Sequence, residues 1–208
     1  MNLPKLYPII DKGMLDAHGL SGGEVARELR GAGVRLIQYR DKVAEPSSIL
    51  RDASVIWEVF AGSGCRLILN DHADLVGPTG FDGVHVGQGD LAPEDARRVV
   101  GAGRWVGVST HNDEQVRIAN ETSADYIAVG PVFATGTKLD ADAVIGLDGV
   151  RRARMLTKKP VVAIGGITLA NTRSVIAAGA DSVAVISALF AEGATIEKVV
   201  RDFLENLR

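Results

Sequence analysis

Eight short apolar segments, each followed by a stretch with helical periodicity, constrain the fold of this chain more than any other feature. The segments predicted as strands are residues 6–10, 34–39, 66–69, 84–86, 105–108, the first half of 125–138, 160–164 and 182–186. The helical patterns cover residues 21–32, 46–62, 74–76, 93–100, 113–121, 146–156, 169–178 and 196–207. Parallel strands require such crossovers, and eight units are the number that closes a (β/α)8 barrel, the TIM-barrel fold of the α/β class.

An open, doubly wound sheet is the alternative fold for this alternation. It predicts a glycine-rich fingerprint directly after the first strand, and the residues there, Asp11, Lys12 and Gly13, do not form one. The chain has 208 residues, and none of its segments resembles an interdomain linker. We therefore predict a single TIM-barrel catalytic domain over residues 1–208.

Composition excludes several classes of protein. Apolar residues make up 46% and charged residues 24% of the chain, which is ordinary for a folded enzyme. The net charge of −3 and the 5% aromatic content argue against nucleic acid as a partner. Cys65 is the only cysteine, so an intrachain disulfide and a cysteine-rich zinc site are excluded. With no signal-peptide pattern and no apolar run that could span a membrane, we expect a cytoplasmic protein. A homo-oligomer is left open.

Polar residues and glycines follow most of the predicted strands. In a barrel of parallel strands the loops after the strands share one face, so these residues are expected to converge. They are Gln38, Arg40, Lys42, Asn70, Asp71, Asp90, Ser109, Thr135, Thr137, Lys138, Gly165, Gly166 and Ser187. Cations, hydroxyl groups and glycine amides suit anionic ligands, so we predict an anion-binding site that also contains two carboxylates.

Asp71 and Asp90 end consecutive strand units, so their carboxylates could approach one point. Oxygen ligands with few protein contributions suit Mg²⁺, which fills its octahedron with water and substrate phosphate oxygens. Either aspartate alone could instead cap the helix that follows it. The cations and the phosphate-type loops predicted at the same rim favour the metal site.

Gly165 and Gly166 follow the seventh predicted strand, while Ile186 and Ser187 follow the eighth. Barrels often bind a phosphate at this part of the rim through backbone amides and a helix N-terminus. Simple tight turns are the alternative. The pairing of the two strand ends favours one monophosphate there, distinct from an anion near strands two to four.

The histidines do not show the spacing of a metal site. His85 lies inside the fourth predicted strand, which indicates a hydrogen-bonded histidine in the core or in a pocket wall. His111 follows Ser109 closely, and either a place in the pocket or one at a helix start is compatible with its position.

Six motifs together are similar to those of one known family. They are Q-Y-R-D-K at 38–42, N-D-H at 70–72, D-G-V-H-V-G-Q-G-D at 82–90, G-V-S-T-H-N at 107–112, G-P-V-F-A-T-G-T-K at 130–138 and A-I-G-G-I at 163–167. In this order and spacing they resemble thiamine-phosphate synthase over essentially the whole chain. The joint match is specific, whereas the Gly-Gly pair or either aspartate alone would not be.

The resemblance implies a transferase that joins 4-amino-2-methyl-5-hydroxymethylpyrimidine diphosphate to 4-methyl-5-(2-hydroxyethyl)thiazole phosphate with Mg²⁺. The products would be thiamine monophosphate and pyrophosphate. By motif, Asp71 and Asp90 would hold the metal. The diphosphate would be bound by Arg40, Lys42, Asn70, Ser109 and Lys138, of which Arg40, Lys42, Ser109 and Lys138 would act in catalysis. The pyrimidine would be bound by Gln38 and His85, and the thiazole phosphate by Thr135, Thr137, Gly165, Gly166, Ile186 and Ser187.

Three other functions compete with this one. A thiazole tautomerase shares the fold and the thiazole phosphate site but needs no metal and no diphosphate ligands, so Lys138, Asp90 and the paired cations argue against it. A phosphate-sugar isomerase or epimerase is a second rival. A catalytically silent protein that binds thiamine-related ligands is the third, and it would bind both substrates without releasing pyrophosphate.

Overall fold

The computed structural model describes residues 2–136 and 143–208 and shows a closed barrel of eight parallel strands in sequence order. The strands are β1 (Leu6–Asp11), β2 (Leu36–Arg40), β3 (Arg66–Asn70), β4 (Gly83–Val86), β5 (Trp105–Thr110), β6 (Tyr126–Val129), β7 (Val161–Ile164) and β8 (Ser182–Val185). Because β1 pairs with both β2 and β8, the sheet has no free edge. The predicted TIM barrel is confirmed.

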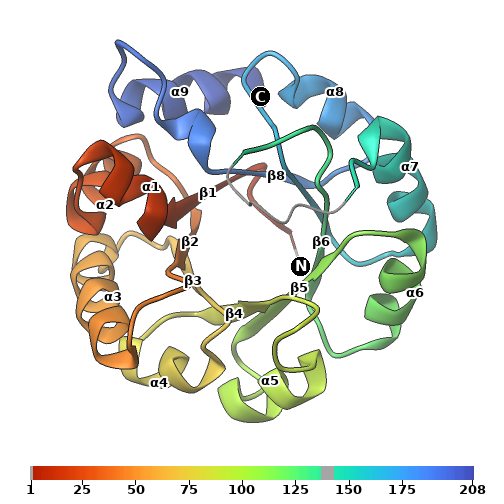
Figure 1. Cartoon of the computed structure of the whole chain (residues 1–208), viewed down its shortest axis with the longest axis horizontal. Coiled ribbons are helices and arrows are strands. Elements are labelled where there is room, and N and C mark those ends of the chain that lie inside the picture. Colours follow the sequence, from red (N-terminus) through yellow and green to blue (C-terminus); the bar gives the residue numbers. More distant parts are fainter. Residues whose placement is uncertain (1, 137–142) are drawn as a thin grey trace.

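Helices surround the barrel as an outer ring, which Figure 1 shows in a view down the shortest axis of the molecule. They are α1 (Lys12–His18), α2 (Gly22–Gly31), α3 (Pro46–Phe60), α4 (Val76–Thr79), α5 (Pro93–Val100), α6 (Asp113–Glu121), α7 (Gly146–Leu156), α8 (Thr172–Ala177) and α9 (Ile196–Asn206). Two short 3₁₀ turns, η1 (Ala73–Leu75) and η2 (Ser187–Leu189), follow β3 and β8.

The alternation of side chains in β2 shows how the sequence separates the two faces of the barrel. Ile37 and Tyr39 belong to the large cluster between the sheet and the helices, while Leu36 belongs to the small cluster inside the barrel. Gln38 lies two residues after Leu36 and therefore also points inward. The same alternation brings Arg40 to the barrel mouth, where the strand ends.

Three element predictions differ from the structure. The short helix predicted over 74–76 is a 3₁₀ turn, and helix α4 follows it through Gly77 and Pro78. The segment after the first strand, which the sequence does not predict to be helical, forms α1, because the Asp11 side chain caps it by accepting the Met14 N–H at 3.1 Å. The helix predicted over 169–178 begins only at Thr172. Its first turn is replaced by side-chain hydrogen bonds of Asn171, which accepts from Thr168 N and donates to Gly166 O.

Leu3 packs inside the barrel with Tyr7 and Leu36, so the N-terminal segment contributes to the inner core. Among the described residues, none of the helices is both long and apolar enough to cross a membrane.

Cys65 is expected to be unreactive in the folded protein. Its side chain is buried, and burial raises the pKa of the thiol to about 12, so the nucleophilic thiolate is scarce at neutral pH. Ellman's reagent at pH 8 should therefore modify about one thiol per chain only after addition of denaturant. Rapid modification of the native protein would contradict this prediction.

Candidate active site

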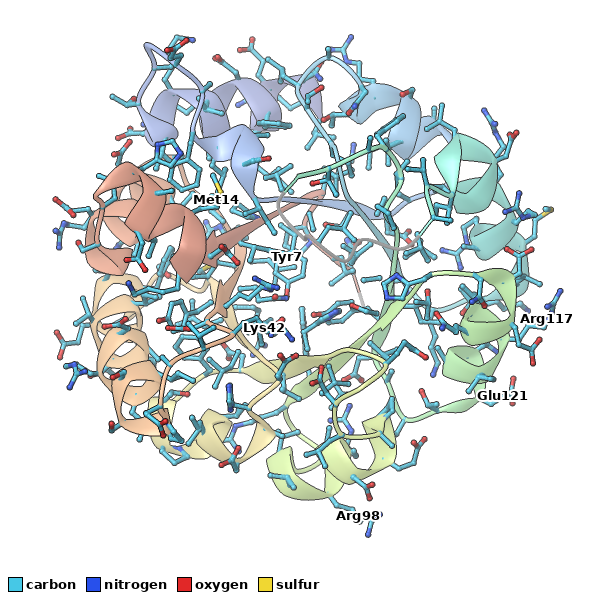
Figure 2. All side chains as sticks on the ribbon, viewed as in Figure 1. Tyr7, Met14, Lys42, Arg98, Arg117 and Glu121 are labelled. Atoms are coloured by element: carbon cyan, nitrogen blue, oxygen red, sulfur yellow. The ribbon has the colours of Figure 1, made fainter. Side chains whose placement is uncertain are left out.

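The strand ends surround a large cavity of about 500 Å³ at the mouth of the barrel. Its floor is apolar and includes Ala128, Val162 and Ala184, whereas its rim is polar. Figure 2 shows Tyr7 and Lys42 near the centre of the ring, while Arg98, Arg117 and Glu121 lie on its outside. An apolar floor under a charged rim suits a ligand with a flat ring and an anionic group.

Two ion pairs place the cations at this rim. The Arg40 guanidinium contacts the Asp11 carboxylate across the pair β1–β2, where the two residues are register partners. Lys42, in the loop after β2, contacts Asp71 directly after β3. The Asp11 side chain is almost fully buried and therefore has little freedom to move. The ion pair with Asp11 accordingly fixes the position of the Arg40 guanidinium at the rim.

Asp71 has an unusual backbone. It is the only residue other than glycine with a positive φ in the described part of the chain, at 63°. Its N–H donates to His85 O at 2.8 Å, and its own carbonyl accepts the Ala73 N–H at 3.0 Å, so both peptide groups fix this conformation. Aspartate tolerates left-handed backbone better than most residues, and such positions concentrate at functional sites.

Asp71 and Asp90 interact directly, and neither caps a helix. Burial and the nearby Asp90 carboxylate raise the pKa of Asp71, although Lys42 opposes this change. Burial also acts to raise the pKa of Asp90, but its hydrogen bonds with Asp71 and with the Gly87 N–H lower it overall. The N-cap positions of η1 and α5 belong to His72 and Ala92. The capping alternative is therefore not what the structure shows.

The oxygen donors at this end of the cavity fit Mg²⁺. The pair raises the pKa of Asp71 and lowers that of Asp90, so the second ionisation of the pair is the hindered one, and a divalent cation beside both carboxyl groups would favour it. Within residues 2–136 and 143–208 the structure has no group of three or more acidic, histidine or cysteine side chains arranged for a metal. Two carboxylates are sufficient for Mg²⁺ when phosphate oxygens of a substrate complete its shell.

His85 lies between the cavity and the inner core. Its Nδ1 is 3.0 Å from Tyr126 Oη, and its Nε2 is 2.9 Å from Ser109 Oγ. Burial lowers the pKa of His85 to about 4, so the ring is neutral near pH 7. The prediction of a hydrogen-bonded histidine in the core or in a pocket wall is confirmed.

Close contact between the end of β7 and the loop after β6 forms the opposite side of the cavity. A Cβ atom on Gly165 would lie 2.6 Å from Pro131 Cα, and one on Gly166 would lie 2.5 Å from Ala134 O. Both glycines have positive φ, at 99° and 63°. These positions therefore need glycine, and the contact brings the turn at Gly166 to the loop that carries Thr135.

This geometry can be set beside known proteins. The family model described as "Thiamine monophosphate synthase" matches residues 6–189. The chain belongs to this family. A thiamine-phosphate synthase of Koribacter versatilis is 49% identical over 197 residues, which cover 92% of each chain. A relative of the same name from Methanocella arvoryzae is 43% identical over 90% of this chain and 87% of its own.

A solved structure agrees with the family assignment. The thiamine phosphate pyrophosphorylase of Pyrococcus furiosus superposes with a TM-score of 0.86 at 31% identity, covering 98% of this chain and 95% of its own. A 3-hexulose-6-phosphate synthase superposes with a TM-score of 0.67 at 19% identity, which is evidence for the shared barrel alone. The predicted resemblance to thiamine-phosphate synthase is confirmed. The thiamine-phosphate synthases to which the chain is similar are transferases.

Most of the predicted site residues meet in the one cavity. Those that line it are Gln38, Arg40, Lys42, Asn70, Asp71, His85, Asp90, Ser109, Thr135, Gly165, Gly166, Ile186 and Ser187. Thr137 and Lys138 lie outside the described residues, so their placement stays a prediction. The Asn70 side chain is buried, and its Nδ2 has no hydrogen-bond partner in the described structure, as expected of a donor that faces a ligand.

The sequence interpretation missed other residues that line the cavity or support its rim. Tyr7 lies within a strand and is indistinguishable there from a core residue, and Asp11 was placed only at a strand end. Gln88 lines the cavity and donates to Ser109 O at 2.6 Å.

His111 also lines the cavity, with Nδ1 2.7 Å from Gly130 O, while Asn112 caps α6. The His111 N–H also donates to Gln115 Oε1 at 2.7 Å, directly before the N-cap, so both places considered for His111, in the pocket and at a helix start, are observed.

Proposed function

We propose that this protein is a thiamine-phosphate synthase, as its family membership indicates. It would join hydroxymethylpyrimidine diphosphate to hydroxyethylthiazole phosphate and release thiamine monophosphate and pyrophosphate. The observation that carries the proposal is the single cavity with two different ends. One end combines Arg40 and Lys42 with two aspartates, and the other is formed by glycine turns beside Thr135.

The proposed roles follow from that division. Arg40, Lys42, Asn70 and Ser109 would bind the diphosphate, with Lys138 joining them. Gln38 and His85 would contact the pyrimidine above the apolar floor. The thiazole phosphate would lie at Thr135, Thr137, Gly165, Gly166, Ile186 and Ser187, so that the thiazole nitrogen faces the pyrimidine methylene carbon.

Asp71 and Asp90 would hold Mg²⁺, which when bound neutralises charge on the diphosphate. The guanidinium of Arg40 and the ammonium of Lys42 would stabilise the charge that builds on the departing pyrophosphate. Since the pyrimidine cation is then attacked by the thiazole nitrogen, the site needs no nucleophilic side chain. What it needs is both substrates held in contact, which the shared cavity would provide.

The decisive experiment mixes both substrates with the purified chain and Mg²⁺ and follows thiamine monophosphate and pyrophosphate together. We expect both products in equal amounts, and none when either substrate is omitted. Binding of both substrates by folded protein without release of pyrophosphate would instead identify the silent binding protein. The tautomerase alternative is not favoured by the relatives, which carry the name thiamine-phosphate synthase.

Two further expectations remain proposals. We infer a cytoplasmic location, because a single buried cysteine suits a reducing compartment. The second is a homo-oligomer, which the sequence allows, and sedimentation analysis of the purified chain would measure its oligomeric state.

A further inference from the structure

A chain of hydrogen bonds runs from one wall of the cavity, through the inner core, and back to the cavity. Gln38 Nε2 donates to Tyr7 Oη at 3.0 Å, and Tyr7 Oη lies 2.9 Å from Tyr126 Oη. Tyr126 Oη lies 3.0 Å from His85 Nδ1, and His85 Nε2 lies 2.9 Å from Ser109 Oγ. All five side chains are buried or partly buried, so their hydrogen bonds do not exchange freely with bulk water.

The direction of these hydrogen bonds is set at the Gln38 end. A phenol has one proton to donate, and the Tyr7 hydroxyl accepts from Gln38, so among its described hydrogen-bond partners only Tyr126 can accept the Tyr7 proton. Tyr126 then donates to His85 Nδ1, and the neutral ring carries its proton on Nε2. If Tyr126 donated to Tyr7 instead, the Tyr7 hydroxyl would accept from both Tyr126 and Gln38. Its own proton would then have no acceptor among the contacts of the described residues.

We propose that this hydrogen-bond chain holds His85 in the tautomer protonated at Nε2, which directs the Ser109 hydroxyl proton into the cavity. With Nε2–H donating to Oγ, the hydroxyl group of Ser109 is left to donate to a ligand oxygen. In the opposite tautomer the same proton would be consumed by His85. That the acceptor of this proton is a diphosphate oxygen rests on the proposed function. The assignment of the His85 tautomer does not.

Tyr126 is the positioning residue in this arrangement. It is fully buried and is not among the residues that line the cavity, so it can act on a ligand only through its neighbours. Gly107, which has no side chain, leaves the space in which Tyr126 and His85 make contact. A Cβ atom on Gly107 would lie 2.4 Å from Tyr126 Oη and 2.5 Å from His85 Nδ1, so a larger residue would break this hydrogen bond.

The test reverses the chain from its far end. In Gln38→Glu at pH 8 the carboxylate accepts from Tyr7 instead of donating to it, so every later hydrogen bond should reverse and the His85 proton should move to Nδ1. Protonated and unprotonated imidazole nitrogens have well separated ¹⁵N shifts. The wild-type protein, whose four histidines are sorted by the spectrum of His85→Gln, should show Nε2–H, and Gln38→Glu should show Nδ1–H.

Tyr126→Phe added to Gln38→Glu interrupts the chain and should prevent the reversal. If Tyr126→Phe does not fold, Tyr7→Phe interrupts the same chain one hydrogen bond earlier. The proposal is overturned if wild-type His85 carries its proton on Nδ1. It is also overturned if the tautomer in Gln38→Glu is unchanged, or if it reverses even when Tyr126 is phenylalanine.

Kinetics give a second, independent readout. Tyr126→Phe should lower kcat by up to about tenfold. Without Tyr126 the His85 tautomer is no longer held, so only a part of the molecules directs the Ser109 proton to the ligand and the about 100-fold effect of one donor to transition-state charge is partly lost. In a Ser109→Ala background it should cause no further loss, since the two residues act on one hydrogen bond. Equal losses in both backgrounds would contradict the proposal.

The matched control is Tyr39→Phe. Tyr39 is equally buried and its hydroxyl group donates to Asp52 at 3.1 Å, but it lies on the outer face of β2. We expect its kcat to stay within about twofold of wild type. If the wild-type protein releases no pyrophosphate, the proposed function fails, and the tautomer spectra alone decide the hydrogen-bond chain.

Discussion

Asp90→Asn will lower kcat/KM for the synthase reaction by roughly 100-fold or more, while the affinity for the thiazole phosphate stays within about twofold. The Asp90 carboxylate accepts the Gly87 N–H at 2.8 Å, and an asparagine side-chain carbonyl can accept the same hydrogen bond. The loop after β4 should therefore keep its shape, and the substitution removes only the negative charge needed to hold Mg²⁺ beside Asp71.

Steady-state kinetics at increasing Mg²⁺ concentration and calorimetric titration of the thiazole phosphate measure the two effects separately. Asp95→Asn is the matched control, because Asp95 lies half-buried in the first turn of α5, outside the cavity lining, and pairs only with its neighbour Arg98 in the described contacts. We expect it to change kcat/KM less than about twofold. An equal loss of thiazole phosphate affinity in Asp90→Asn would show that the proposed division of the cavity is wrong.

The barrel could be predicted because its signals are local. Each strand is a short apolar run ended by breakers, and Pro46 and Pro93 begin their helices at the positions where a missing N–H costs nothing. Helix α1 was missed because its signals are weak. Gly13 lies in its first turn, it buries one apolar side chain, Leu15, and its cap comes from Asp11, which also ends a strand.

The site could be predicted in outline because topology alone gathers strand ends on one face. The pair formed by Asp11 and Arg40 could not, since it depends on the register between β1 and β2, which the barrel fixes as a whole. Tyr7 and Tyr126 were hidden for a different reason. In the sequence each is a large residue in an apolar strand, and only the packing inside the barrel shows that their hydroxyl groups meet.

Because the glycine turn after β7 lies at only one end of the cavity, a substitution there should weaken binding of one substrate and leave binding of the other unchanged. Gly166→Ala is expected to weaken binding of the thiazole phosphate more than about tenfold, because a displaced loop loses hydrogen bonds to the phosphate and each hydrogen bond to a charged group contributes about 1.5–3 kcal/mol. The new Cβ would lie 2.5 Å from Ala134 O and 2.7 Å from Phe133 Cβ, so the loop that carries Thr135 has to move. The carboxylates and cations near β2 to β4 are untouched, so binding of the pyrimidine diphosphate should change less than about twofold.

Gly62→Ala separates this displacement from simple backbone strain. Gly62 has φ 70°, close to the 63° of Gly166, but a Cβ atom there would meet nothing within 4 Å. Both variants should lose about 1–2 kcal/mol of stability to the left-handed backbone, visible as a lower Tm, and only Gly166→Ala should lose thiazole phosphate affinity. If Gly62→Ala lost that affinity too, general destabilisation would explain the effect. If Gly166→Ala kept it, the thiazole phosphate would bind elsewhere. Taken with Asp90→Asn, opposite patterns of loss in the two variants would establish two substrate sites in one cavity.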